Sequence, residues 1–140
     1  MSTLLPTMDA DVLGTTNTFE YETQPDYTHK LNIDSNRVAG FVDELEAYKQ
    51  AVYKLINTER YEHIIYSWNY GVELKDLFGQ PIPYVVPEIE RRLTEGIMAD
   101  DRTESVGDFE FDTSKRGVVH VKFKCTSIYG TVSMETDVNV

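Results

Sequence analysis

Residues 118–138, VVHVKFKCTSIYGTVSMETDV, decide the fold class of this chain. Apolar side chains recur at every second position, and charged or polar residues fill the positions between them. A period of two is typical of strands with one buried face, and Tyr129-Gly130 supplies the turn between two such strands. Phe109 and Phe111 alternate in the same way before this stretch. The sequence therefore predicts a three-stranded antiparallel meander at the C-terminal end.

Two helices are predicted upstream of the meander. The first covers about 43–57: an aspartate can cap it, Glu46 stands three residues later, and apolar residues follow at helical spacing. The second covers about 87–100, because Pro87 suits a first helical turn, where its missing N–H costs nothing. A short strand over 28–33 precedes both helices. The fold class is α+β, with two main helices packed on a small antiparallel sheet that ends in the meander.

The predicted core combines the apolar faces of these elements. It consists of Leu45, Val52, Ile56, Ile89, Leu93, Val119, Val121 and Phe123.

The chain of 140 residues has the length of one domain. Residues 1–26 are acidic, rich in threonine and without helical periodicity, so we expect an extended N-terminal arm. This arm is either a disordered tail or a segment that binds a partner. Residues 27–140 are expected to form the single α+β domain.

The charge excludes several classes of partner. There are 13 basic and 24 acidic residues, which gives a net charge of −11. Long-range repulsion makes nucleic acid or an anionic membrane an unsuitable partner for such a chain. No signal peptide or apolar run of membrane-spanning length is visible, which predicts a protein that begins in a cytoplasm. The single Cys125 rules out an internal disulfide.

No pattern of catalytic or metal-binding residues stands out. His29, His63 and His120 are far apart and fit no metal-ligand spacing, and Cys125 alternates with core residues as a buried, inert thiol would. We therefore expect no metal, cofactor or catalytic residue. Carboxylates are plentiful, so counting alone leaves open a two-carboxylate hydrolase that uses Glu59 and Glu62.

Aromatic residues crowd the segment between the helices. This set has two interpretations, an interface for other proteins or ordinary packing at the edge of the core. Its members are Tyr61, Tyr66, Trp68, Tyr70, Phe78 and Tyr84.

Two motifs in 40–102, followed by the strands of 117–132, carry a family resemblance. Glu59-Arg60 is followed by Tyr70-Gly71 and a short leucine-containing segment, with a longer gap than in the broader family. The triplet Asp100–Arg102 stands where that family has Glu-Pro-Arg, so its proline is replaced. With these motifs the chain resembles the sheath-initiator, or lysozyme-like, baseplate wedge proteins of contractile phage tails. The likeness is to the branch found in prophages and tail-like bacteriocins of Gram-positive bacteria.

The resemblance implies a structural role without catalysis. It implies baseplate wedge proteins, tail tube or hub proteins and the sheath protein as partners, with multiple copies of the chain in a symmetric ring. It also implies assembly in the host bacterial cytoplasm and a final place in the baseplate. The wedge would contact Asp100, Asp101, Arg102, Glu59 and Arg60.

The last strand is expected to offer an open edge to the sheath. Strand addition supplies affinity through main-chain hydrogen bonds, and the resemblance implies that the first sheath ring docks in this way. The residues concerned are Thr131, Ser133, Glu135, Thr136 and Val138. Two alternatives remain open here, a peptidoglycan hydrolase of the tail and a free-standing acidic module that binds proteins.

Overall fold

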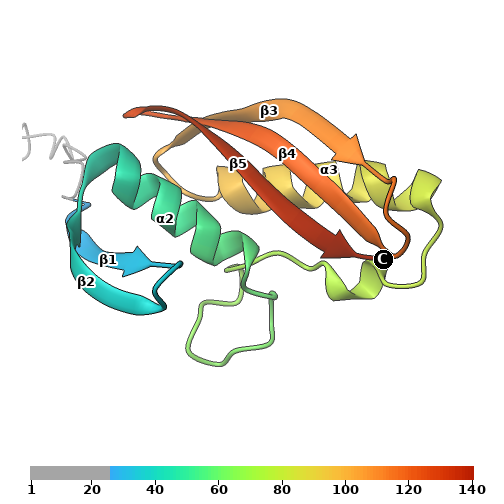
Figure 1. Cartoon of the computed structure of the whole chain (residues 1–140), viewed down its shortest axis with the longest axis horizontal. Helices are drawn as coiled ribbons and strands as arrows, with labels where there is room; N and C mark the ends of the chain where they lie inside the picture. Colours follow the sequence, from blue (N-terminus) through green and yellow to red (C-terminus); the bar gives the residue numbers. More distant parts are fainter. Residues whose placement is uncertain (1–25) are drawn as a thin grey trace, which may run out of the picture.

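The computed structural model describes residues 26–140, and Figure 1 shows how they are arranged. The predicted N-terminal arm lies, apart from Asp26, outside the described residues. In chain order the elements are β1 (Thr28–Asn32), β2 (Arg37–Val42), α2 (Glu44–Ile56), the 3₁₀ helix η1 (Lys75–Leu77), α3 (Ile82–Met98), β3 (Thr103–Asp112), β4 (Val118–Ser127) and β5 (Gly130–Asn139). The α+β class is confirmed.

The predicted C-terminal meander is present as a sheet with the order β3-β4-β5. β4 and β5 pair without interruption from Val118↔Asn139 to Ser127↔Gly130. The pairing of β3 with β4 shifts register twice, between Thr103 and Ser105 and again after Gly107. The two outer strands therefore differ in regularity although both pair with the same central strand.

Both main helices form, but the predicted start of the second one is wrong. Asp43 caps α2, and its carboxylate accepts a hydrogen bond from the Glu44 N–H at 2.8 Å. α3 begins at Ile82 rather than at Pro87, which lies inside the helix. Pro83 already occupies the first turn, where no N–H is needed. The missing N–H of Pro87 removes only one bond near the start of a 17-residue helix, so the helix continues through it.

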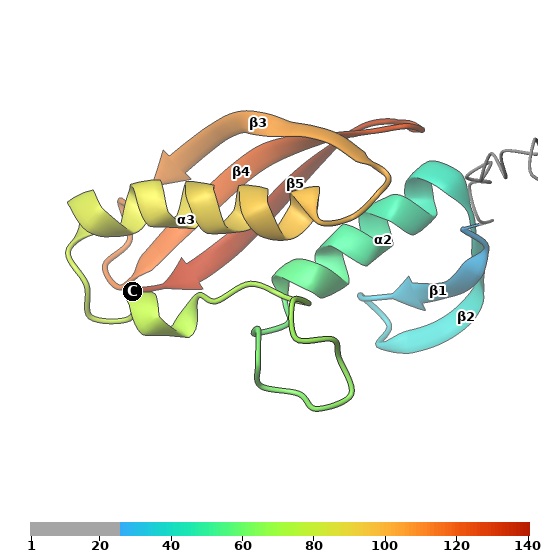
Figure 2. The ribbon, with the colours of Figure 1, turned by 180° about the vertical axis from the view of Figure 1, so that it is seen from behind.

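The core lies between the sheet and the two helices. Figure 2 shows α3 crossing the face of the meander, while α2 runs alongside β5. Val121 and Phe123 of β4 meet Leu93 of α3 in one buried cluster. The predicted core residues are buried except Leu45, which is partly buried.

The N-terminal strands form a separate two-stranded sheet rather than joining the meander. Gln50 of α2 holds it through two hydrogen bonds of 2.8 Å, accepting from the Leu31 N–H and donating to the His29 carbonyl. A two-stranded hairpin is marginally stable alone, so these contacts matter for its position. None of the described helices has the length and apolar character needed to cross a membrane.

Candidate functional site

The outer edge of β5 carries backbone groups that have no partner within the sheet. The Val140 N–H donates to the Gly117 carbonyl at 3.0 Å, which makes Gly117 and Val140 a hydrogen-bonded pair. Hydrogen-bonded and non-hydrogen-bonded pairs alternate along an antiparallel ladder, and this ladder has no bulge. The even-numbered residues of β5 therefore bond to β4, whereas the odd-numbered residues direct their N–H and C=O groups outward.

This alternation shows which of the predicted edge residues have backbone groups that face outward. The outward backbone groups belong to Thr131, Ser133, Glu135, Asp137 and Asn139, and no recorded hydrogen bond from residues 26–140 reaches them. Thr136 and Val138 were included among the edge residues, but their backbone groups face β4. Their side chains lie on the inner face of the sheet, where Val138 is buried. Asp137 and Asn139 were missed, because alternation of side chains does not show which residues of a strand bond to its neighbour.

The opposite edge, β3, is irregular. One register shift lies at its start and the other in its middle, between Gly107 and Glu110, where Asp108 adopts a positive φ of 53°. Bulges of this kind twist an edge and interrupt the row of groups that another strand would need. β5 has no such interruption.

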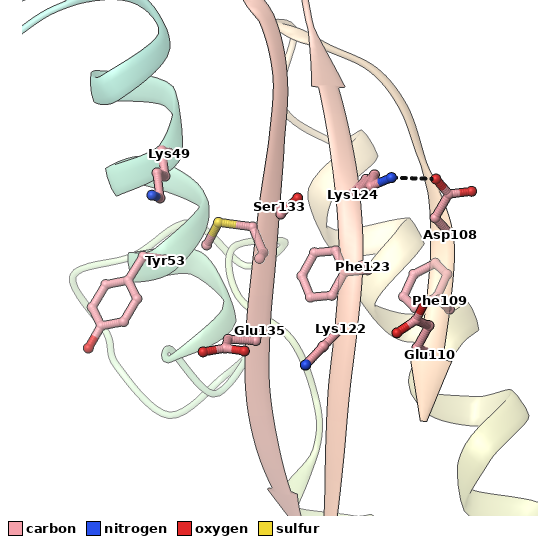
Figure 3. A pocket seen from close by; sticks show the side chains of 11 residues that line it. Lys49, Tyr53, Asp108, Phe109, Glu110, Lys122, Phe123, Lys124, Ser133 and Glu135 are labelled. Atoms are coloured by element: carbon pink, nitrogen blue, oxygen red, sulfur yellow. Dashed lines mark ion pairs between the residues drawn. The ribbon is translucent and has the colours of Figure 1, made fainter. Parts of the chain in front are cut away.

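The solvent face of the meander is charged. Figure 3 shows Lys122 of β4 between Glu110 of β3 and Glu135 of β5. In the next row, His120 Nδ1 lies 2.5 Å from Asp137 Oδ1 on β5, and its Nε2 lies 3.6 Å from a Glu135 oxygen. The hydrogen bond to Asp137 raises the pKa of His120 above its ordinary value.

Arg102, predicted to hold a wedge partner, lies in an internal ion-pair cluster. Its Nε and Nη2 donate to the two carboxylate oxygens of Asp100 at 2.9 and 2.7 Å, and its Nη1 donates to Asp26 at 2.9 Å. Its guanidinium also lies over the Tyr48 ring, 5.6 Å from the centroid. Burial opposes ionisation of Asp100, yet the hydrogen bonds from Arg102 hold the pKa of this carboxyl below its usual range. Asp101, by contrast, is exposed.

Glu59 and Arg60, the other two predicted wedge residues, close the neck of the loop between α2 and η1. The Glu59 carboxylate accepts hydrogen bonds from the N–H groups of Leu74 and Lys75, each at 3.1 Å. Arg60 Nε donates to the Gly71 carbonyl at 3.2 Å. Gly71 has a φ of +96°, and a Cβ there would meet the Thr58 carbonyl oxygen at 2.5 Å. The close approach of the two chain segments at the neck therefore requires glycine at position 71.

The loop above this neck exposes large apolar side chains. Ile64 is fully exposed, Ile65 is 86% exposed and Trp68 is 76% exposed. The rings of Tyr61 and Trp68 lie 4.9 Å apart, and those of Tyr66 and Tyr70 lie 4.7 Å apart. An exposed apolar cluster of this kind is typical of a protein interface. Of the two interpretations of the aromatic segment, packing at the edge of the core holds for Tyr70, which lies against the core cluster, whereas Trp68 is exposed and available to an interface.

The two groups of predicted wedge residues, Glu59-Arg60 and Asp100–Arg102, both lie beside α3 but do not contact each other. Arg60 forms an ion pair with Glu95 of α3 at 3.6 Å, and Arg102 follows the C-terminal end of that helix. Asp26 was missed as a partner of Arg102, because no sequence pattern links residues 76 positions apart.

No catalytic constellation emerges in the described part of the chain. Residues 26–140 contain no cluster of histidine, cysteine, aspartate and glutamate suited to a metal ion. Cys125 is buried in β4, and burial raises the pKa of its thiol to about 11, so the reactive thiolate is scarce near neutral pH. The candidate hydrolase pair has structural partners: the Glu59 carboxylate accepts from the N–H groups of Leu74 and Lys75, and the Glu62 carboxylate accepts from the Lys75 ammonium.

Comparisons with known proteins point to one family. The family model described as "Contractile injection system sheath initiator" matches residues 19–130. The chain is also 36% identical over 113 residues to "Phage-like element PBSX protein XkdS" of Bacillus subtilis (strain 168). That alignment covers 77% of this chain and 79% of the relative.

Proposed function

Since the chain belongs to the sheath-initiator family of contractile injection systems and is thus a structural tail component rather than an enzyme, we propose that it starts sheath assembly through β5. In this proposal, the first ring of sheath subunits adds a strand to the outer edge of β5. The same molecule binds the baseplate wedge and the tail tube or hub through other surfaces.

The regularity of the β5 edge carries this proposal. Five consecutive odd-numbered residues, from Thr131 to Asn139, present outward N–H and C=O groups in an unbroken row. Strand addition needs such a row, because main-chain hydrogen bonds supply its affinity. β3 lacks it, since two register shifts divide that strand.

Ser133→Pro tests the docking model at its centre. Proline removes one outward N–H, and because that group does not bond to β4 the sheet itself should persist. We expect tail particles with this variant to carry baseplates that lack full-length sheath, as counted by negative-stain electron microscopy. The matched control is Ser133→Ala, which keeps the N–H. Normal numbers of sheathed particles from Ser133→Pro would contradict the model.

We further propose that the wedge contacts the exposed loop between Tyr61 and Trp68. Glu59 and Arg60 then act by fixing the neck, while the apolar side chains above it make the contact. Asp101 and the Arg102 cluster lie at the C-terminal end of α3, and we assign them to the border of the same contact. Large apolar and aromatic side chains supply most of the energy in protein interfaces, which fits this division of roles.

The loop contact can be tested without disturbing the fold. Ile64→Ser combined with Trp68→Ser changes exposed side chains only, so the free energy of unfolding should stay within about 0.5 kcal/mol of the wild type. We expect the double variant to be missing from purified baseplates, whereas Phe78→Ser, an exposed aromatic outside the loop, should be incorporated. Normal incorporation of the double variant would exclude the loop as the contact.

The remaining parts of the proposal concern the location of the protein, its copy number and its domain boundary. The protein assembles in the host bacterial cytoplasm and stays in the baseplate of the released particle, with several copies in a ring. The domain boundary is proposed at residue 27, with residues 1–26 as a partner-binding arm whose last residue, Asp26, is held to the domain by Arg102. Copy number is measurable by quantitative mass spectrometry of purified tails.

A further inference from the structure

Charge alternates from strand to strand across the solvent face of the meander. Glu110 of β3 is paired in register with Lys122 of β4, which in turn is paired with Glu135 of β5. The neighbouring row reads Asp112, His120 and Asp137 in the same order. In both rows an acid on each outer strand flanks a basic group on the central strand. Opposite charges directly across a sheet stabilise the pairing of strands.

The acidic side chains of β5 have ion-pair partners only on the side of the strand that faces β4, within residues 26–140. The carboxylates of Glu135 and Asp137 are 68% and 66% exposed, and their ion-pair contacts within residues 26–140 run to His120 on the β4 side. On the other side of β5 the backbone groups of the same two residues point outward. A strand added there would place two of its side chains directly beside these carboxylates, two residues apart.

A cavity of about 170 Å³ lies beside the inner face of β5, between β5, α2 and the β1–β2 hairpin. Apolar side chains, among them Leu31, Val42 and Met134, supply most of its lining surface, and Lys30, Glu46, Lys49 and Gln50 also line it. An apolar cavity of about 150 Å³ holds a group the size of benzene, so this space suits one aliphatic side chain. Met134 precedes Glu135, so a strand residue beside Met134 points toward this cavity while its neighbour beside Glu135 points toward solvent.

We propose that the edge of β5 selects a strand in which lysine or arginine alternates with aliphatic residues. The basic side chains lie beside Glu135 and Asp137 and extend the alternation of charge to a fourth strand. The aliphatic residue beside Met134 enters the cavity lined by Tyr53 of α2. In an antiparallel strand the order is basic, any residue, basic, aliphatic. This inference rests on the proposed docking at β5 and adds the chemistry of the segment that docks.

Three peptides probe this preference on the full-length protein. One alternates lysine with valine between threonine ends, the second replaces both lysines by glutamate, and the third has the first composition with the two lysines adjacent. Dissociation constants come from fluorescence anisotropy at low salt. Amide hydrogen exchange measured by NMR at Ser133, Glu135 and Asp137 reports whether binding occurs at the edge.

We expect the alternating lysine peptide to bind about tenfold more tightly than the glutamate peptide, because two attractive cross-strand pairs replace two repulsive ones. It should also slow exchange at the three amides, which the peptide with adjacent lysines should not do. The preference should shrink or reverse in Glu135→Lys. Glu110→Lys is the matched control, because it changes net charge equally and removes the other acid paired with Lys122. There the preference should persist.

Two results would overturn the inference. The first is a failure of the charge preference: equal affinity for the lysine and glutamate peptides would show that the edge does not select basic residues, and equal effects of Glu135→Lys and Glu110→Lys would indicate attraction to the net charge alone. The second is the absence of slowed exchange at the three amides with any peptide at millimolar concentration. Docking of the sheath itself is judged separately, because Ser133→Pro would still block sheath assembly if the edge is used without this preference.

Discussion

The two edges of the meander flank the same central strand yet differ in what they offer another chain. β5 pairs with β4 through ten successive residue pairs, and every second residue directs its backbone outward. β3 is broken by two register shifts, and this is the difference between the edges, because each outer strand also has a helix beside it, α3 at β3 and α2 at β5. Soluble proteins protect edges with bulges, so β3 has the form of a protected edge. The regular edge of β5 is the form that the proposed docking of a sheath strand requires.

A substitution in the core that supports both edges should cause the largest loss of stability. Leu93 of α3 is fully buried in the cluster that supports the meander. Leu93→Ala should lower the free energy of unfolding by about 2–5 kcal/mol, through lost burial and the cavity that remains. Chemical denaturation measures this loss, and hydrogen exchange should quicken on β3 and β5 alike. A loss below about 1 kcal/mol would show that Leu93 contributes little to the core. Faster exchange on β3 alone would show that the two edges do not share one core.

Removal of the Arg102 side chain should lower the stability of the domain at the start of β3. Arg102 precedes β3, and its carbonyl accepts a hydrogen bond from the Ile128 N–H at 3.0 Å. Arg102→Ala leaves two largely buried carboxylates, Asp100 and Asp26, without their cation, and should cost about 1–3 kcal/mol in unfolding free energy. The matched control is Asp101→Ala, which should have almost no effect. Equal stability of both variants would show that the cluster contributes little.

Proline substitutions along β5 sharpen the assignment of outward and inward backbone groups. Thr136→Pro removes a bond to β4 and should cost about 1–3 kcal/mol, whereas Ser133→Pro should cost less than about 0.5 kcal/mol. Thermal unfolding of the two variants, each compared with alanine at the same position, measures the difference. Similar losses at both positions would mean that the alternation is assigned incorrectly.

Sequence patterns predict some parts of this molecule well, for physical reasons. The meander follows from side-chain alternation, because a period of two places alternate residues on a buried face. The start of α3 does not follow, since Pro81, Pro83 and Pro87 are each compatible with the beginning of a helix. The separate β1–β2 sheet depends on Gln50, whose amide bonds to a strand about 20 residues earlier in the chain.

The candidate site was predictable only in part. The resemblance led to β5, but which of its residues face outward depends on the pairing of Val140 with Gly117. The resemblance implies that Arg102 binds a partner, whereas in the structure its guanidinium binds Asp26 across 76 positions of the chain. Contacts at such separation leave no periodic signal in a single sequence.

The smallest expected effect concerns His120, which lies between the two edges. Its hydrogen bond to Asp137 on β5 raises its pKa, whereas Asp112, its register neighbour on β3, accepts a hydrogen bond from the Ser114 N–H. A histidine whose pKa is higher in the folded state contributes stability below its unfolded pKa of about 6.5. That contribution disappears as the pH rises through the folded pKa.

Titration of His120 by NMR should therefore separate the two edges. Asp137→Asn should lower the pKa of His120 toward its ordinary value, and Asp112→Asn should lower it less, because only the first removes a direct hydrogen bond. In the wild type, the free energy of unfolding relative to His120→Asn should be greater at about pH 5.5 than at about pH 8.5. Equal pKa changes in the two aspartate variants would show that His120 senses the general acidity of the face. In that case Asp137 of β5 would interact with His120 of the central strand no more strongly than Asp112 of β3 does.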